Sequence, residues 1–264
     1  MESHLTGDDY FDSYVAVMGN LGGDDLPTSK FTEHELLDGT MNNDITFREK
    51  RSIADRVPLW HKENCIQCNQ CSFVCPHATI RPFLLDENEL AKAPDIVKND
   101  VRDAVGVPGL KFRIQVSSRN CVGCALCVTE CSFNKMGKVD ENGKKLFALE
   151  MAEAKSQFPQ EEGADYLYKN VTYKNDRLPA ALQSTVKGMG FLMPYMEISG
   201  ACAGCGETPY YRLLSQLFGK DMLVANATGC SSIYSGSTPL TPFCTDKDGQ
   251  GIAWANSLFE DNAE

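Results

Sequence analysis

Residues 111–116, Lys-Phe-Arg-Ile-Gln-Val, alternate between polar and apolar side chains. A period of two predicts a β-strand with one face in the core and the other toward solvent. Farther along the chain, a helix is predicted around Leu149–Phe158, because Pro159 follows and ends it. The middle of the chain therefore mixes strand and helix.

The pattern changes after Met196. Thr208 and Pro209 are typical of a helix N-terminus and Gly219 of a helix end. Apolar residues recur between them at helical spacing, namely Tyr210, Leu213, Leu214 and Leu217. Residues 222–225 then predict a short buried strand, and residues 229–232 a Gly-rich turn. Helix, strand and turn in this order indicate the opening of an α/β layer.

Length and composition narrow the class of protein. A chain of 264 residues provides one or two domains, and a hydrophobic fraction of 42% argues against general disorder. No apolar run reaches the roughly 18 residues that span a membrane. A net charge of -11 disfavours a nucleic-acid partner, since phosphates attract basic surfaces. We therefore expect a protein that binds neither nucleic acid nor membrane.

The N-terminal segment is strongly acidic. Residues 1–50 contain eleven acidic side chains against three basic ones, which is typical of a solvated linker. The alternative is a docking surface for a basic partner. Apolar residues at 10–18 predict a short patch at the end of a preceding domain. The first residues resemble neither a signal peptide nor a transit peptide, so we expect the cytoplasm or an anaerobic organelle.

The twelve cysteines are the most informative residues. Eight lie in two runs with the spacing C-x2-C-x2-C-x3-C, and the second run repeats the first after 56 positions. Disulfide frameworks are typical of short secreted chains, and structural zinc sites use separated pairs of ligands. The uninterrupted runs therefore favour two [4Fe–4S] clusters over both alternatives.

The spacing rule also predicts which cysteines share a cluster. In two-cluster bacterial ferredoxins the fourth cysteine of each run ligates the other cluster. Applied to this chain, the rule gives two ligand sets: Cys65, Cys68, Cys71 and Cys131 for one cluster, and Cys121, Cys124, Cys127 and Cys75 for the other. Pro76 follows the first run as this pattern favours, whereas Ser132 follows the second. The 45 residues between the runs predict an insertion that contains the strand at 112–116.

Three further cysteines lie in Gly-rich turns. Cys202 and Cys205 lie within Ser199 to Glu207, and Cys230 follows within Asn226 to Tyr234. From its spacing alone, the C-x2-C pair is consistent with a redox pair, half of a zinc site or part of a cluster. A Gly-Ser turn after a strand is also where backbone N–H groups meet an anionic ligand, although an ordinary tight turn has the same composition.

The order of these motifs resembles that of the pyruvate:ferredoxin (flavodoxin) oxidoreductases, which use thiamine diphosphate in anaerobic 2-oxoacid metabolism. The stretches that carry the resemblance are spread over residues 49–262: Glu49-Lys50-Arg51, Cys65 to Cys71, Val74 to Ala78, Ser199 to Pro209, Asn226 to Tyr234 and Ala253 to Asn262.

The resemblance implies the oxidative decarboxylation of pyruvate to acetyl-CoA and CO2, with electrons leaving through the clusters to ferredoxin or flavodoxin. It implies a third [4Fe–4S] cluster, ligated by Cys202, Cys205 and Cys230, whose fourth ligand lies beyond residue 264. Cys244 does not correspond to that ligand. Glu207 and Cys230 match positions that contact thiamine diphosphate, which the family binds with Mg²⁺, and Phe259 is expected near this cofactor. No residue of the chain is assigned a catalytic role.

We predict an α+β ferredoxin-like two-cluster module followed by the opening of an α/β thiamine-diphosphate-binding domain. The predicted parts are an acidic linker or end of a preceding domain at 1–58, the two-cluster domain at 59–140, a connecting segment at 141–195 and a truncated thiamine domain at 196–264.

The family's upstream and downstream motifs are absent, so we expect an electron-transfer fragment that is inactive on pyruvate alone. It would work with the remaining domains or subunits, as a homo-oligomer when complete, on pyruvate and coenzyme A. The alternative is an autonomous two-cluster electron carrier or adaptor without thiamine chemistry.

Overall fold

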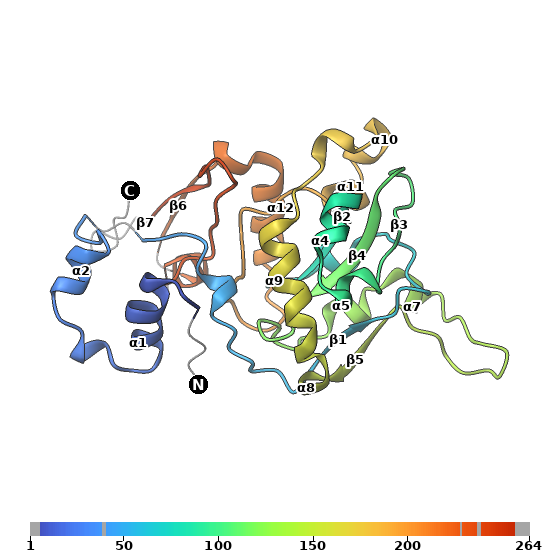
Figure 1. Cartoon of the computed structure of the whole chain (residues 1–264), viewed down its shortest axis with the longest axis horizontal. Coiled ribbons are helices and arrows are strands. Elements are labelled where there is room, and N and C mark those ends of the chain that lie inside the picture. Colours follow the sequence, from blue (N-terminus) through green and yellow to red (C-terminus); the bar gives the residue numbers. More distant parts are fainter. Residues whose placement is uncertain (1–5, 39–40, 228, 237–238, 257–264) are drawn as a thin grey trace. The chain divides into compact units, whose positions relative to one another are not determined.

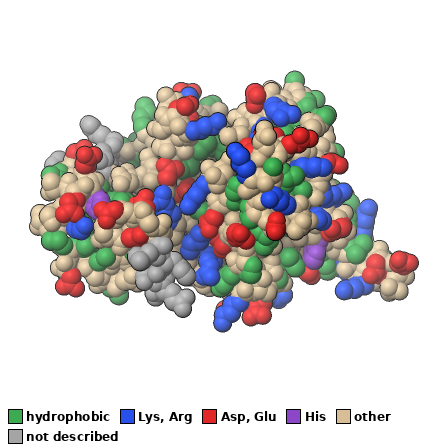
Figure 2. Space-filling model, in the orientation of Figure 1, with side chains coloured by type: hydrophobic (Ala, Val, Ile, Leu, Met, Phe, Trp, Pro, Cys, Tyr) green, Lys and Arg blue, Asp and Glu red, His purple; other side chains and the backbone are tan. Residues whose placement is uncertain are grey.

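The structure is a computed structural model, and it describes residues 6–38, 41–227, 229–236 and 239–256. Contacts group the chain into two compact units. Unit 1 comprises Met1–Arg51, Tyr195–Ala201 and Phe218–Glu264, and unit 2 comprises Ser52–Pro194 and Cys202–Leu217. Among the described residues, no helix is both long and apolar enough to cross a membrane. Acidic and basic side chains are interspersed over the visible face of unit 2 (Figure 2).

The centre of unit 2 is an antiparallel three-stranded sheet of order β2-β4-β3 (Figure 1). Its strands are β2 (Ile80–Leu85), β4 (Lys111–Val116) and β3 (Arg102–Asp103). The predicted strand at 112–116 is therefore confirmed as part of β4. Phe112, Ile114 and Val116 lie in the main apolar core of the unit, which also contains five of the cysteines of the two runs.

The other face of this sheet is also buried, so the prediction of a half-buried strand is wrong. Arg113 and Gln115 are each only 1% exposed, because α9 (Glu161–Asn170) packs over them. Gly163 allows this close approach, since a Cβ there would lie 3.0 Å from Oε1 of Gln115. The buried polar groups have hydrogen-bond partners. Arg113 donates hydrogen bonds to Asp100 and Gln115, and these bonds offset the cost of burying the polar face.

A second sheet pairs β1 (Arg56–Trp60) with β5 (Leu149–Glu153) in antiparallel register. The helix predicted at 149–158 is therefore wrong in its first half. Trp60 pairs with Leu149 far along the sequence, and this ladder determines the conformation that local composition could not. Helix begins only at α8 (Ala154–Gln157), which continues into a 3-10 turn at Phe158–Gln160.

The remaining elements of unit 2 are mostly short helices. They are α3 (Gln70–Phe73), α4 (Glu87–Lys92), α5 (Asp95–Lys98), α6 (Leu126–Thr129), α7 (Ser132–Lys135), a 3-10 turn at Asn175–Arg177, α10 (Ala180–Gln183), α11 (Val186–Met189) and α12 (Thr208–Phe218). Helix α12 confirms the helix predicted from Thr208 onward. Helices α3 and α6 each contain a cysteine of the runs, Cys131 directly precedes α7, and α11 and α12 contact the first run.

Unit 1 has its own small apolar cluster. Tyr10, Phe11, Tyr14 and Val15 pack against Ile45, so the acidic segment contains a folded part at its predicted apolar patch. The helical elements here are a π-helical turn at Phe11–Val15, α1 (Ala16–Gly19), α2 (Ser29–Glu33) and 3-10 turns at Gly23–Asp25, Thr46–Arg48 and Gly219–Asp221.

The C-terminal part of unit 1 contains two parallel strands, β6 (Leu223–Asn226) and β7 (Ala253–Asn256). The strand predicted at 222–225 is not fully buried, because Leu223 is 86% exposed while Val224 is buried. The predicted turn at 229–232 is instead the start of α13 (Cys230–Ser235), with Gly229 preceding the helix. A strand followed by a helix at this point agrees with α/β alternation.

Candidate iron–sulfur centres

The two cysteine runs repeat one local conformation. Gln67 and its counterpart Gly123, 56 positions later, both have positive φ, at 57° and 72°. Asn69 and Ala125, the next equivalent pair, both have φ of 61°, and each immediately precedes a four-residue helix, α3 or α6. The sequence repeat is therefore a structural repeat of the loops.

The first thiol set brings Cys131 to the three leading cysteines of the first run. The side chains of Cys65 and Cys71 both lie within electrostatic range of Cys68 and Cys131. Cys68 Sγ also lies 3.6 Å from the hydroxyl oxygen of Ser132, the residue that follows the second run. Burial raises the pKa of both the Cys65 and the Cys71 thiol, and charges on the neighbouring thiols raise it further.

The second thiol set is built the same way, from the three leading cysteines of the second run and Cys75. Cys121 and Cys127 both lie within electrostatic range of Cys75 and Cys124. Cys75, Cys121, Cys124 and Cys127 all line one cavity. Burial raises the pKa of the Cys121 thiol to about 12 and that of Cys127 well above its ordinary value.

Thr79 lies between the two runs. Its hydroxyl is 3.6 Å from Cys75 Sγ, and it also hydrogen-bonds the Cys121 side chain, which lowers the pKa of that thiol against the effect of burial. The residue comes from the start of the insertion, directly before β2. Sequence reasoning missed it, because a single Thr near a cysteine run carries no recognisable pattern.

The two thiol sets differ from a site for one ion. In the part of the chain that the structure describes, no three or more His, Cys, Asp or Glu side chains are arranged to hold a metal ion. No disulfide joins any of the twelve cysteines. A [4Fe–4S] cluster binds each thiolate through a different iron atom, so its ligands surround a space rather than converge on one point. Two sets of four thiols, one around a cavity, suit that geometry.

Cys202 and Cys205 lie in a turn of unit 2 that runs along the second cysteine loop. A Cβ on Gly204, between them, would lie 4.0 Å from Cβ of Cys124. The N–H of Glu207 donates to Sγ of Cys205 at 3.4 Å, which repeats the hydrogen bonds from Gln67 to Cys65 and from Gly123 to Cys121. The C-x2-C pair therefore has the same backbone-to-sulfur bond as both runs.

The other residues predicted for the third cluster and for thiamine diphosphate are divided between the two units. Glu207 is exposed in unit 2, whereas Cys230 is exposed in unit 1 at the start of α13. Cys244 also belongs to unit 1, where it is buried. Phe259 lies outside the described residues. The structure therefore places Cys202 and Cys205 in one turn of unit 2 and Cys230 in unit 1.

Helix α12 presents polar side chains to the cysteine loops. Thr208 donates from its hydroxyl to the backbone oxygen of Pro76 at 2.6 Å, and Arg212 donates to the backbone oxygens of Ser72 and Phe73. Thr208, Arg212 and Ser215 are buried, whereas the apolar stripe at 210, 214 and 217 is exposed. The stripe that predicted the helix is thus not its buried side, and sequence reasoning missed Arg212 for that reason.

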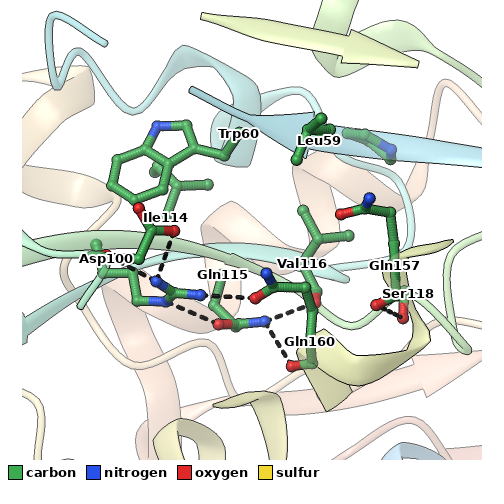
Figure 3. A pocket seen from close by; sticks show the side chains of 11 residues that line it. Leu59, Trp60, Asp100, Ile114, Gln115, Val116, Ser118, Gln157 and Gln160 are labelled. Carbon is green, nitrogen blue, oxygen red and sulfur yellow. Dashed lines mark hydrogen bonds and ion pairs between the residues drawn. The ribbon is translucent and has the colours of Figure 1, made fainter. Parts of the chain in front are cut away.

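A second cavity lies away from the cysteines, between β1, β4 and the turn before α9. Figure 3 shows Trp60 and Asp100 at one end and Gln157 and Gln160 at the other. Arg113 pairs with Asp100 at 2.9 Å and donates to Gln160 at 2.7 Å. No cysteine lines this cavity, and its polar groups bond mainly to one another, so we assign the network to the fold.

Comparison with known proteins identifies the part that contains the runs. Residues 64–135 match the family model for a 4Fe-4S dicluster domain. Over 250 residues, the chain is 48% identical to pyruvate:ferredoxin oxidoreductase of Moorella thermoacetica, covering 92% of this chain and 19% of the relative. It is 44% identical over 256 residues to pyruvate-flavodoxin oxidoreductase of Klebsiella pneumoniae, covering 97% and 20%.

A third relative is the mitochondrial pyruvate dehydrogenase [NADP(+)] of Euglena gracilis, which is 43% identical over 263 residues, covering 98% of this chain and 13% of the relative. The chain thus spans a fifth or less of the length of these curated relatives. The resemblance inferred from the motifs is confirmed. The chain is a homologue of one segment of the pyruvate:ferredoxin and pyruvate-flavodoxin oxidoreductases, and this segment contains a 4Fe-4S dicluster domain.

Proposed function

We propose that the chain is the electron-transfer portion of a pyruvate:ferredoxin (flavodoxin) oxidoreductase and that its eight ferredoxin-type cysteines ligate two [4Fe–4S] clusters. The grouping of the thiols carries the proposal, because each set combines three cysteines of one run with the fourth of the other. Thiolates are the ligands that such clusters require, and the eight are mostly buried with apolar neighbours. When bound, the clusters accept and release single electrons.

In each thiol set, a backbone N–H group donates a hydrogen bond that can stabilise a thiolate. The N–H groups of Gln67 and Gly123 point at Cys65 and Cys121, 3.4 Å from each sulfur, and hydrogen bonds of this kind stabilise thiolates and help to set cluster potentials. The two sets adjoin, since Cys71 of the first set lies within electrostatic range of Cys127 of the second. An electron can therefore pass from one set to the other inside unit 2.

An anaerobic count of iron and acid-labile sulfide tests the number of clusters. We expect about eight irons per chain for two clusters. Zinc without iron would contradict the proposal.

Double variants test which cysteines share a cluster. Under crossed ligation, C68S/C131S damages one set only, so about four irons should remain. The matched variant C124S/C131S damages both sets, so no intact cluster should remain. If each run instead ligated its own cluster, the two results would be exchanged. This comparison separates the two models with one assay, because both variants remove two cysteines.

A third cluster is proposed at Cys202, Cys205 and Cys230. The backbone bond to Cys205 and the position of Gly204 beside Cys124 support it. This position also gives an order for the electrons: from the C-x2-C turn to the second thiol set and then to the first. We expect about twelve irons if the site acquires a fourth ligand and about eight if it does not. In the first case C202S should return the count to about eight, and C244S tests Cys244 as the fourth ligand.

The reaction proposed for the complete enzyme is oxidative decarboxylation of pyruvate to acetyl-CoA and CO2, with coenzyme A as acetyl acceptor. Residues 196–264 would open its thiamine-diphosphate domain, and the parallel pair β6–β7, with α13 between the two strands in the sequence, supports that α/β assignment. Glu207 and Cys230 would contact thiamine diphosphate, whose Mg²⁺ site we place in the remaining domains or subunits. Joining E207Q to those parts should weaken thiamine diphosphate binding in a titration; unchanged binding would remove Glu207 from the site.

Ferredoxin or flavodoxin is the proposed electron acceptor, as the names of two relatives state for those proteins. The chain, reduced with dithionite and freed of excess reductant, should reduce added ferredoxin or flavodoxin in a stopped-flow experiment. Reduction of either carrier supports this role. Failure with both, while the clusters remain intact, would contradict it.

A further inference from the structure

Arg212 is a buried cation without a carboxylate partner. Its side chain is 2% exposed, and its two terminal nitrogens donate to the backbone oxygens of Ser72 and Phe73. Among the described residues no Asp or Glu pairs with it, and its Nε has no hydrogen-bond partner. An isolated guanidinium in a protein interior is costly, so a compensating negative charge is expected close by.

The surroundings of Arg212 point to the cysteines as the source of that charge. Burial lowers its pKa to about 10, which leaves it protonated at neutral pH. The nearby cation Arg81 lowers the pKa further, whereas the thiols of Cys75 and Cys71 oppose both effects. Tyr168 raises this pKa as well, but Cys75 has the largest effect among the groups that raise it, so the thiols are the main source of negative charge near Arg212.

Arg212 lies against residues 72–76, the segment that connects a cysteine of the first set to a cysteine of the second. Cys71 belongs to the first set and Cys75 to the second, and the oxygens that Arg212 binds lie between them. Thr208, one helical turn before Arg212 on α12, holds Pro76 on the far side of Cys75. Helix α12 thereby fixes residues 72–76 at both ends and keeps the guanidinium there.

We propose that Arg212 is a positioning residue whose fixed positive charge, held against the backbone between Cys71 and Cys75, makes both clusters easier to reduce. The inference rests on the proposed ligation of two clusters. A [4Fe–4S] cluster with four thiolates is anionic, and reduction adds one further negative charge. A nearby cation in a medium of low dielectric constant stabilises the reduced form more than the oxidised form. Removing the charge therefore lowers both reduction potentials.

Potentiometric titration of the full chain, followed by electron paramagnetic resonance under anaerobic conditions, tests this. R212M removes the charge and keeps a long apolar side chain, R212Q removes the charge and keeps a donor, and R212K keeps the charge. R177M is the matched control, because Arg177 is an exposed residue of the same unit. Iron is counted in every sample, so that loss of a cluster is not mistaken for a shifted potential.

We expect R212M and R212Q to retain the parent iron content and to reduce the equilibrium constant for reduction at least tenfold, which is about 59 mV for a one-electron couple. R212K and R177M should stay within threefold of the parent. If the neutral variants keep intact clusters and unchanged reduction potentials, the inference about Arg212 is wrong but the proposed function is not. A parent chain that binds no iron would instead overturn the proposed function. If only R212M loses iron, the potential measured for R212Q decides whether the inference holds. If both neutral variants lose iron while R212K does not, Arg212 is needed for cluster assembly and the proposed effect on the reduction potential is wrong.

Discussion

Replacing Gly123 with Ala should shorten the lifetime of the clusters, because this glycine meets two constraints at once. Its φ of +72° costs an L-residue roughly 1–2 kcal/mol. A Cβ at this position would also lie 2.8 Å from the backbone oxygen of Arg56, which cannot rotate away because Arg56 is paired in β1. Overpacking of this kind costs roughly 1–3 kcal/mol, while the stiffer unfolded chain returns roughly 0.4–1 kcal/mol. The net destabilisation is about 3 kcal/mol.

Loss of iron is irreversible, so stability is measured as a rate: the half-life of the visible cluster absorbance in a fixed urea concentration without oxygen. We expect G123A to lose its absorbance at least tenfold faster than the parent. Ala125→Gly is the control from the same loop, since Ala125 has a φ of +61° and relief of its strain is nearly balanced by the freer unfolded chain. A half-life of G123A within twofold of the parent would refute the reasoning.

Three further predictions address the core, unit 1 and cluster loading. Asp100→Ala removes the ion partner of buried Arg113 and should lower the unfolding free energy by about 2 kcal/mol, less than for a fully buried pair because the Asp100 side chain is 32% exposed; an unchanged melting temperature would contradict this. Tyr14→Ala should make unit 1 sensitive to limited proteolysis, because it removes about 3 kcal/mol of packing, while the eight irons expected in unit 2 remain. Loss of those eight irons would contradict this. Burial raises the pKa of Cys121 to about 12, and this thiol must lose its proton to bind iron. Iron loading should therefore release protons and be more complete at pH 8.5 than at pH 7.0. Equal iron uptake at the two pH values would contradict this.

The sequence predicted the dicluster domain and the family resemblance better than it predicted the packing of the chain. The spacing of the two runs placed Cys131 with the first run and Cys75 with the second, and the structure brings these same thiols together. The pattern at 111–116 predicted β4 but not the burial of its polar face. That face is covered by a helix about 45 residues farther on, and a local pattern cannot show which element packs against it.

Local sequence patterns also failed to predict the strand at 149–153 and the orientation of helix α12. The segment 149–153 has composition compatible with a helix, and only its distant partner β1 makes it a strand. Helix α12 was predicted correctly as a helix, yet its orientation was not, because its polar residues bind backbone oxygens of the cysteine loop. A rule that places apolar stripes inward fails where a helix packs against exposed carbonyl groups.

The proposed exchange of the fourth cysteines would also change when each ligand set is completed during synthesis. If each run formed its own set, the first would be complete at residue 75 and the second only 56 residues later, at residue 131. With the exchange, the second set is complete when Cys127 has been made and the first when Cys131 follows, four residues later. At roughly 5–20 residues per second, this shortens the interval between the two completed sets from several seconds to less than one. Under the proposed crossed ligation, the two ligand sets would therefore be completed within four residues of each other during synthesis.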